Sequence, residues 1–304
     1  MRFAKGHGTE NDFVILLDPG NSQGLTAGLA ARLCDRRAGI GGDGVLRVVR
    51  TAAYRAENAP GAASGAGEPP GAGADRAEWF MDYRNADGSL AEMCGNGIRV
   101  FARYLVRHGL AEGPEFTVAT RSGPRQVRLG ANGDVTAEMG SVAVLGRGSA
   151  VVAGRAYPGL RVFVGNPHLV CLVDAPLAGL DLSRAPHLDP GEFPEGGNVE
   201  LVRVTGPASV ALRVHERGSG ETRSCGTGAV AAAAAAAAPA APEAGRGGDG
   251  TGGVAVPGGV LTVTLAAGRA WLTGPAVIVA EGELDPAWLA AGHLASTNAG
   301  DRGA

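Results

Sequence analysis

Alternation of hydrophobic and polar residues along the chain predicts short strands in five places. The runs that are β-branched or alternating, and mostly bounded by Gly, Pro or Asn, are 13–17, 126–129, 199–204, 210–214 and 260–265. Such runs are typical of β-strands.

Two segments predict helices, and each follows a Cys-Gly-x-Gly sequence. In the first, Ile98, Phe101 and Leu105 recur at helical spacing, and His108-Gly109 supplies a C-terminal stop. Another face carries Arg99, Arg103 and Arg107. The second, 229–238, is almost entirely alanine, the residue with the highest helix propensity. Because a helix without a polar face is normally buried, we expect this one inside the fold.

Two stretches lack any apolar periodicity. Residues 52–77 and 239–253 are rich in Gly, Ala and Pro, a composition that does not support a packed core. We expect the first to be a mobile surface insertion and the second to be similar.

The two halves of the chain share landmarks in one register. Cys94-Gly-Asn-Gly is repeated as Cys225-Gly-Thr-Gly, with Asn85 and Glu216 each nine residues upstream of the cysteine. Asn11 resembles Asn166, and Gly41-Gly42-Asp43 resembles Gly196-Gly197-Asn198, with 32 positions from the asparagine to the last residue in both cases. Duplicated halves change the expected architecture. We expect two similar α/β domains, each with a sheet around one helix that begins after a cysteine.

The charge balance limits the class of partner. Lys and Arg total 27 against 30 for Asp and Glu, a net charge of −3, which provides no footprint for nucleic acid or an anionic membrane. The longest apolar run is far shorter than the roughly 20 residues of a spanning helix, and residues 1–18 lack a signal-peptide core. We therefore expect a cytoplasmic protein.

The four cysteines fall into two kinds. None has the paired spacing of a zinc site or a redox motif. Cys34 and Cys171 are expected to be small buried hydrophobic residues. Cys94 and Cys225 each precede a helix, where unpaired amides and the helix dipole stabilise a thiolate and lower the pKa of a thiol.

Two equivalent cysteines suggest a reaction that inverts a stereocentre, with one cysteine on each face of the reacting carbon. If one thiolate removes a proton from a carbon and a thiol delivers a proton to the opposite face, the stereocentre is inverted. Pyridoxal phosphate would need a lysine, and Lys5 is the only one in the chain. The two helix N-termini could instead bind the α-carboxylate, so we expect a racemase or epimerase without a cofactor.

The chain resembles the diaminopimelate epimerase family from end to end. The motifs that carry the resemblance are KGHGTENDF (5–13), CDRRAGIGGDG (34–44), RNADGSLAEMCGNGIR (84–99), GNPH (165–168), GNVE (197–200) and ERGSGETRSCGTGA (216–229). The resemblance implies interconversion of LL- and meso-2,6-diaminopimelate in lysine and peptidoglycan-precursor biosynthesis, without pyridoxal phosphate or metal. A homodimer is common in that family.

The resemblance also implies a fold. That fold is α/β (α+β), with two pseudo-symmetric domains, each a mostly antiparallel sheet rolled around a central helix, and an active site in the cleft between them. We expect an N-terminal half at 1–123, which includes the 52–77 insertion and to which the chain returns with 276–290, and a C-terminal half at 124–275.

Residue roles follow from the motifs by resemblance. Cys94 and Cys225 are expected as the acid/base pair, and His168 and Glu216 as residues that tune their proton affinities. The expected substrate-binding residues are Asn11, Asn85, Gly95, Asn96, Asn166, Asn198, Glu216, Arg217, Gly226 and Thr227. Arg217 suits the distal carboxylate because its planar fork matches that group.

Some positions depart from the family pattern. Thr9-Glu10 replaces the common small or apolar pair, and Gly44 stands where some members have a Gln that contacts substrate. Asp12 and Asp43 lie in motif segments and are expected to cap turns.

Two other functions remain open at this point. A proline or hydroxyproline racemase would use two cysteines on the same fold, whereas Glu216-Arg217 with Asn166 and Asn198 favours a substrate with a second zwitterionic end. A thiol-switch binding protein would join Cys94 and Cys225 in a regulatory disulfide.

Overall fold

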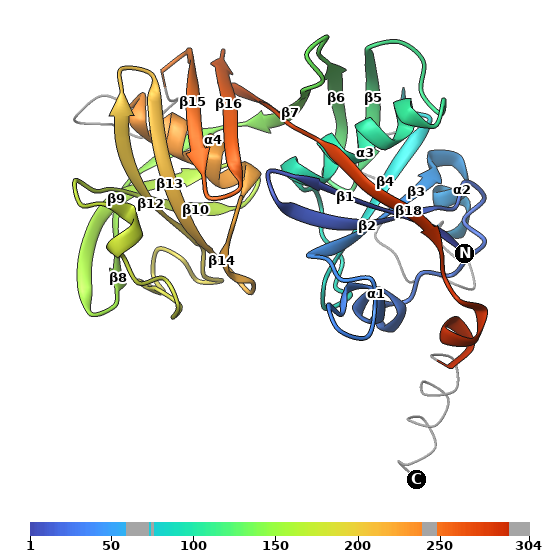
Figure 1. Ribbon diagram of the computed structural model, residues 1–304. Coiled ribbons are helices and arrows are strands. Elements are labelled where there is room, and N and C mark those ends of the chain that lie inside the picture. The colour runs from blue at the N-terminus through green and yellow to red at the C-terminus, as the bar shows by residue number, and fades with distance from the viewer. Residues whose placement is uncertain (59–72, 74–75, 239–247, 292–304) are drawn as a thin grey trace. The chain divides into compact units, whose positions relative to one another are not determined.

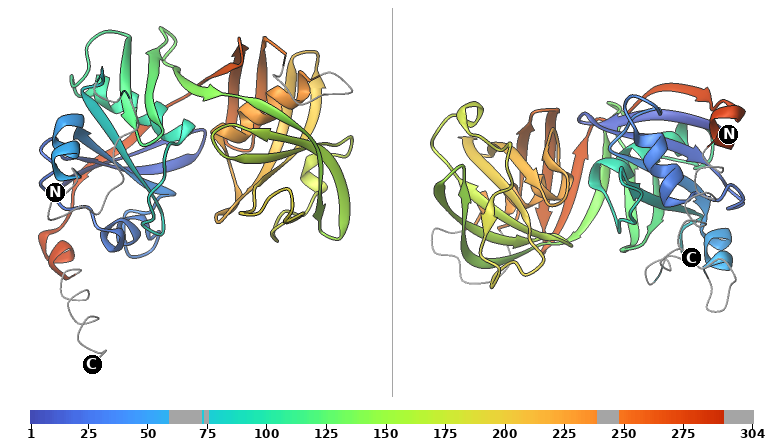
Figure 2. Two further views of the ribbon diagram at one scale, coloured as in Figure 1. Left: turned by 180° about the vertical axis from the view of Figure 1, so that it is seen from behind. Right: turned by 90° about the horizontal axis from the view of Figure 1, so that it is seen from below.

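The chain folds into two compact units in a computed structural model (Figures 1 and 2). The structure describes residues 1–58, 73, 76–238 and 248–291. Unit 1 comprises Met1–Gly8, Asp12–Leu129 and Ala276–Ala304, and unit 2 comprises Thr9–Asn11 and Gly130–Pro275. No helix in the described ranges is long and apolar enough to cross a membrane.

Unit 1 contains a mixed sheet and several helices. Its strands are β1 (Arg2–Gly8), β2 (Asn11–Leu17), β3 (Gly44–Arg50), β4 (Trp79–Asn85), β5 (Glu115–Thr120), β6 (Gly123–Leu129) and β18 (Val277–Glu283). Its helices include α1 (Ala27–Cys34), α2 (Thr51–Glu57) and α3 (Gly95–Arg107), and residues 286–291 are also helical. Strands β1, β3, β4, β6 and β18 pack against α3, so the sheet wraps around this helix.

Unit 2 repeats this plan around α4 (Gly226–Ala236). Its longer strands are β7 (Val135–Ser141), β8 (Ala143–Val152), β9 (Arg155–Phe163), β10 (Pro167–Leu172), β12 (Asn198–Gly206), β13 (Ser209–Glu216), β15 (Gly250–Val256), β16 (Gly259–Ala266) and β17 (Arg269–Gly274). Shorter elements are β11 (His187–Leu188), β14 (Gly220–Thr222) and the 3-10 turn Leu177–Gly179. Strands β9, β10, β12, β13, β15, β16 and β17 pack against α4 (Figure 1).

The same order of strand pairings confirms the internal duplication. In unit 1, β2 pairs parallel with β3, β3 antiparallel with β4, β4 parallel with β5, and β5 antiparallel with β6. In unit 2, β10, β12, β13, β15 and β16 repeat the sequence parallel, antiparallel, parallel, antiparallel. Each helix lies in the chain between the third and fourth strands of its series.

The strand register corrects one landmark of the duplication. Phe13 pairs with Gly44 and Gly44 with Asn85, whereas His168 pairs with Asn198 and Val199 with His215. This register sets Asn198 opposite Glu216, as Gly44 is opposite Asn85. The counterpart of Asn198 in unit 1 is therefore Gly44. The match of Asp43 with Asn198 is therefore displaced by one residue.

All five strands and both helices expected from the sequence are present. The alanine helix is buried as expected, with Ala229, Ala231 and Ala232 fully enclosed. Arg99 departs from expectation because it lies within the core at 0% exposure, where its Nη1 donates to the carbonyl of Gly95 at 3.1 Å. The supposed polar face of α3 is therefore not wholly exposed.

The two stretches without periodicity are partly ordered, which corrects their assignment. Thr51–Glu57 forms α2, because Tyr54 stacks on Phe80 with 4.0 Å between the ring centroids. The segment Gly250–Val256 forms β15, so the second stretch ends in a strand. Residues 59–72, 74–75 and 239–247 lie outside the described residues.

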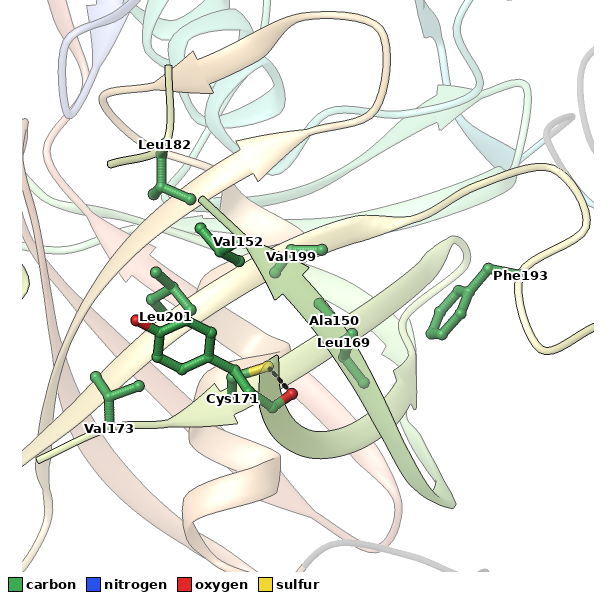
Figure 3. Close-up of a cluster of buried hydrophobic side chains, with 10 residues drawn as sticks. Ala150, Val152, Leu169, Cys171, Val173, Leu182, Phe193, Val199 and Leu201 are labelled. Carbon is green, nitrogen blue, oxygen red and sulfur yellow. Dashed lines mark hydrogen bonds between the residues drawn. The ribbon is translucent and has the colours of Figure 1, made fainter. Parts of the chain in front are cut away.

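The core of unit 2 includes Cys171 (Figure 3). Its side chain packs among Leu169, Val199 and Leu201, and its thiol donates to the carbonyl of Tyr157 at 3.6 Å. Burial raises the pKa of Cys171 to about 12 and that of Cys34 to about 11. Both thiols are structural, as the sequence predicts.

Candidate active site

Helix α3 begins at Cys94 in unit 1. Cys94 is the N-cap, with extended backbone angles, and its Sγ accepts from the backbone N–H of Gly97 at 3.3 Å. An N-cap side chain normally satisfies one of the unpaired amides of the first turn. The sulfur therefore lies where the partial positive charge of the helix terminus is greatest.

The residues around Cys94 are tightly held. Gly95 and Asn96 form the first turn of α3 and are buried. Asn85 ends β4 and donates from Nδ2 to Ser89 Oγ at 3.0 Å. Unit 1 thus carries the cysteine and three candidate substrate residues, with Gly95 and Asn96 directly after Cys94 and Asn85 at the end of β4.

Helix α4 begins at Cys225 with the same geometry. The Sγ of Cys225 accepts from the backbone N–H of Gly228 at 3.3 Å and lies 3.4 Å from Thr227 Oγ1. The predicted helix-start cysteines are therefore both N-caps with sulfur as the acceptor.

The pKa of Cys225 moves in the direction opposite to that expected for a helix N-terminus. Burial raises it well above the usual 9, and the nearby carboxyl groups of Glu216 and Glu200 raise it further. Hydrogen bonds from Thr227 and the Gly228 amide lower it but do not compensate. Desolvation and like charge thus outweigh the helix terminus and favour the thiol form of Cys225.

His168 lies in a buried chain of polar groups beneath α4. Its Nδ1 is 2.7 Å from Glu200 Oε1, and its Nε2 is 2.8 Å from Asn166 Oδ1. His168 and Glu200 are both 0% exposed. The sequence motifs located His168 and Asn166 but assigned no role to Glu200. A charged residue at the inward third position of Asn198-Val199-Glu200 was the available signal, because strand residues i and i+2 share a face.

The other candidate residues of unit 2 surround Asn198. The Oδ1 of Asn198 accepts from the Arg217 backbone N–H at 2.9 Å. The guanidinium of Arg217 donates to the Glu195 carbonyl at 3.0 Å and is nearly half exposed. Glu216 Oε1 accepts a hydrogen bond from Thr222 Oγ1, and burial of the carboxyl raises the pKa of Glu216.

Asn11 groups with unit 2 through the turn that precedes it. Thr9 and Glu10 both have positive φ, 50° and 61°, which is uncommon for residues with a side chain. Thr9 Oγ1 lies 2.7 Å from Ser224 Oγ, and Glu10 pairs with Arg223. This unusual pair of residues therefore anchors the turn to the two residues immediately before Cys225.

The single lysine is engaged in an ion-pair cluster of unit 1. Lys5 Nζ lies 2.6 Å from Asp12 Oδ2 and also donates to the carbonyl of Gly41. Arg36 bonds both oxygens of Asp12 and reaches Asp43 at 2.8 Å. Asp12 and Asp43 therefore form ion pairs as well as making local backbone contacts.

Position 44 has no room for a longer side chain in this backbone. A Cβ at Gly44 would lie 2.5 Å from the carbonyl oxygen of Arg84 and 2.6 Å from the ring of Tyr83. Glycine is the residue that permits this close approach. A Gln side chain would therefore not fit at this position without a shift of the backbone.

Sequence comparison identifies one family over almost the whole chain. The family description of diaminopimelate epimerase matches residues 3–145 and 161–282. The diaminopimelate epimerase of Thermobifida fusca is 56% identical over 284 residues, which cover 93% of this chain and 98% of that protein. The Mycolicibacterium smegmatis protein of the same name is 50% identical over 297 residues, covering 95% and 98%.

Solved structures with much lower identity share the fold. A Bacillus anthracis phenazine biosynthesis protein of the PhzF family has a TM-score of 0.60 at 16% identity, covering 94% of this chain and 99% of that one. A hydroxyproline epimerase from Agrobacterium vitis has a TM-score of 0.58 at 16% identity, covering 94% of both chains. At this level of identity these two structures bear on the architecture alone. Taken with the duplicated fold and its two cysteine N-caps, the full-length matches show that this chain belongs to the diaminopimelate epimerase family.

Proposed function

We propose that this chain interconverts LL- and meso-2,6-diaminopimelate, in the supply of lysine and of peptidoglycan precursors. Membership of the family supports the substrate, and the two cysteine N-caps support the chemistry. The observation that carries the proposal is the repeated thiol at a helix N-terminus, since two such thiols supply an acid and a base.

The proposed reaction moves one proton off Cα and another onto its opposite face. A thiolate takes the Cα proton and becomes a thiol, while the other thiol donates its proton to the carbanion and becomes a thiolate. The raised pKa of Cys225 favours its protonated form, so in one direction of the reaction Cys225 is proposed to start as the acid, with Cys94 as the base. One turnover therefore reverses the two forms, so that the former thiolate is a thiol and the former thiol is a thiolate.

The α-carboxylate is proposed to bind at the first turns of the two helices. Gly95 and Asn96 open α3, and Gly226 and Thr227 open α4. Amides of a first helical turn have no intrahelical partner, so they can donate to an oxyanion. Charge that develops on the carboxylate as the proton leaves would be stabilised by these amides.

The remaining candidates are proposed to hold the distal end of the substrate. The set consists of Asn11, Asn85, Asn166, Asn198, Glu216 and Arg217. The half-exposed guanidinium of Arg217 offers a planar fork for the distal carboxylate. Lys5 is held by Asp12 and Gly41, and these bonds would have to break before its amine could form a Schiff base.

We also propose a cytoplasmic homodimer that acts on this small molecule and on neither nucleic acid nor a membrane. No disulfide joins any of the four cysteines within the described residues, and a two-thiol mechanism needs both Cys94 and Cys225 as thiols or thiolates. Val277 and Val279 of β18 are exposed at 42% and 61%, which provides apolar surface for a second copy. Sedimentation of the purified chain tests the assembly.

The decisive experiment is exchange of the Cα hydrogen. Incubation of the reduced protein with LL-diaminopimelate in deuterated water should place deuterium at Cα and yield the meso isomer. Absence of label would exclude the epimerase. Incubation with L-proline and with hydroxyproline tests the racemase alternative, and label on either compound in place of diaminopimelate would favour it.

The two-base mechanism requires both cysteines. Cys94→Ala and Cys225→Ala should each reduce epimerisation by about three orders of magnitude or more, since general acid and base catalysis each contribute about 10²–10⁴-fold. Cys34→Ala is the matched control because Cys34 is a buried thiol in the hydrophobic core of unit 1. Near-native turnover by either of the first two variants would exclude the mechanism. Full activity after Cys94 and Cys225 are joined in a disulfide would equally contradict it.

A further inference from the structure

The buried His168–Glu200 pair lies on two adjacent strands of unit 2. His168 on β10 pairs in register with Asn198, and Glu200 follows two residues later on β12. The two side chains thus share one face of the sheet. Their atoms Nδ1 and Oε1 are 2.7 Å apart, and neither side chain is exposed.

Both ring nitrogens of His168 face oxygen atoms. Nδ1 meets the Glu200 carboxyl, and Nε2 meets Asn166 Oδ1 at 2.8 Å. An amide oxygen accepts hydrogen bonds only, and a carboxylate does the same. Hydrogen bonds from the ring to both oxygens require a hydrogen on each nitrogen, which is the imidazolium form paired with a carboxylate.

Unit 1 has no such charge at the equivalent positions. A Cβ at Gly97 would meet Leu46 at 3.2 Å and Phe13 at 3.5 Å, whereas one at Gly228 would meet Glu200 Oε1 at 2.7 Å. By strand register, Phe13 corresponds to His168 and Leu46 to Glu200. Hydrophobic residues are sufficient to support a cysteine-capped helix, so the charged pair in unit 2 serves another purpose.

The Asn166 amide is oriented by its contact with the ring. Its Oδ1 lies 2.8 Å from His168 Nε2, so Nδ2 is directed away from the ring. Asn166 is partly exposed, and its Nδ2 makes no hydrogen bond to another described residue. The amide N–H groups are therefore left to donate to an anionic ligand.

We propose that Glu200 is a positioning residue that keeps His168 as an imidazolium and thereby fixes Asn166 with its NH₂ group toward the substrate. The inference rests on the proposed function, because the ligand that Asn166 meets is the zwitterionic amino acid. The titratable groups that interact with His168 or Glu200 are Glu216, Cys225 and Cys171. Glu200 Oε2 makes no hydrogen bond to another described residue. His168 is therefore the principal partner that offsets the cost of burying the Glu200 carboxylate.

Removal of the negative charge should reverse the Asn166 amide. In Glu200→Gln the buried ring loses its counter-charge and becomes neutral, with one nitrogen that accepts. The Asn166 amide then turns to donate from Nδ2 to His168 Nε2 and presents Oδ1 to the substrate. An oxygen facing a carboxylate should raise KM about ten- to one-hundred-fold, the scale of one unsatisfied hydrogen bond to a charged group, with a smaller change in kcat.

Two measurements test the proposal. In protein labelled with ¹⁵N-histidine, both His168 nitrogens of the wild type should carry hydrogen at pH 8, and one should lose it in Glu200→Gln. The signals are assigned by their loss in His168→Gln. A neutral His168 in the wild type would overturn the proposal whether or not Glu200→Gln folds, and independently of any epimerase activity.

A double-mutant cycle then separates positioning from general damage. If Glu200 acts through Asn166, Glu200→Gln should add little to the increased KM of Asn166→Ala. Additive effects would contradict action through Asn166.

Glu138→Gln is the control, since Glu138 is also a buried carboxylate of unit 2 and pairs with Arg269. It should leave KM and the His168 signals unchanged, and an equal effect of Glu138→Gln would overturn the proposal. Loss of Cα exchange in the wild type would instead reject the proposed function.

Discussion

Each candidate acid/base residue is a cysteine N-cap whose sulfur is held by the third residue of the helix. The repeated Cys-Gly-x-Gly sequence was enough to predict both positions. It could not predict the protonation of Cys225, because the opposing carboxyl groups come from β12 and from the end of β13. Local sequence therefore located the thiols, and packing between distant segments determines the pKa.

The same limit explains why Glu200 was missed. Its strand is otherwise hydrophobic, and a single acidic residue in such a run is equally compatible with exposure at an edge. Only the pairing of β10 with β12 shows that the carboxyl meets His168.

Alkylation should distinguish the four thiols. At pH 8, iodoacetamide should modify Cys94 first, because it is half-buried while Cys225 is 5% exposed and both Cys34 and Cys171 are in the core. A raised pKa reduces the thiolate fraction about tenfold for each unit, so Cys225 should react slowly and gain reactivity as the pH rises. Peptide mass spectrometry measures the order.

A variant of Glu216 tests the cause of the slow reaction. Glu216→Gln removes a negative charge that raises the Cys225 pKa, and should speed alkylation of Cys225 at pH 8 by about threefold or more. Glu221→Gln is the control, since Glu221 pairs with Arg213 at the surface. Preferential modification of Cys225 in the wild type would contradict the assignment of the thiol form.

At the scale of elements, the predicted strands were those with clean alternation or β-branched runs. Strand β4 escaped prediction because it carries Asp82 and Arg84 among its hydrophobic residues. Both are buried, and Asp82 is paired with Arg47 at 2.7 Å and with Arg121. A buried strand is not visible in the hydrophobicity pattern when it contains charged residues whose ion-pair partners lie far away in sequence. Helix α2 was missed for a related reason, since its small residues fold around one buried aromatic, Tyr54.

The alanine helix permits a direct test of packing. Ala232→Leu introduces a larger side chain at a position with 0% exposure and should lower the free energy of unfolding by about 1–3 kcal/mol. Ala236→Leu, at the exposed end of the same helix, should change it by less than about 0.5 kcal/mol. Urea unfolding followed by circular dichroism measures both, and equal stabilities would show that the sheet does not close tightly around α4.

At the scale of the whole molecule, the duplication was visible in the sequence, and the shared order of strand pairings confirms it. The register of one landmark was wrong by one residue because equal intervals of 32 positions conceal the offset that pairs Gly44, and not Asp43, with the strand position of Asn198. Six specific motifs identify a family, but the exact hydrogen-bonded partner of a residue depends on how the strands pair in space.

The C-terminal strand should be essential to unit 1. β18 pairs antiparallel with β1, and Leu284 and Trp288 pack in the core around α1. A chain that ends at Pro275 should therefore lose amide protection in β1 and α3 while β12 and α4 of unit 2 stay protected. Hydrogen exchange with mass spectrometry tests this expectation, and unchanged protection of β1 would show that β18 is dispensable.

Two copies of one ancestral unit within a single chain are free to diverge separately. A homodimer assembled from one such unit would place the same residues beneath both thiols, so a mutation to Glu at the position of Leu46 would appear on both sides at once. In the joined chain, one copy keeps Phe13 and Leu46 while the other carries His168 and Glu200. The joined chain can therefore carry unequal surroundings for its two thiols, which two identical copies of one unit could not.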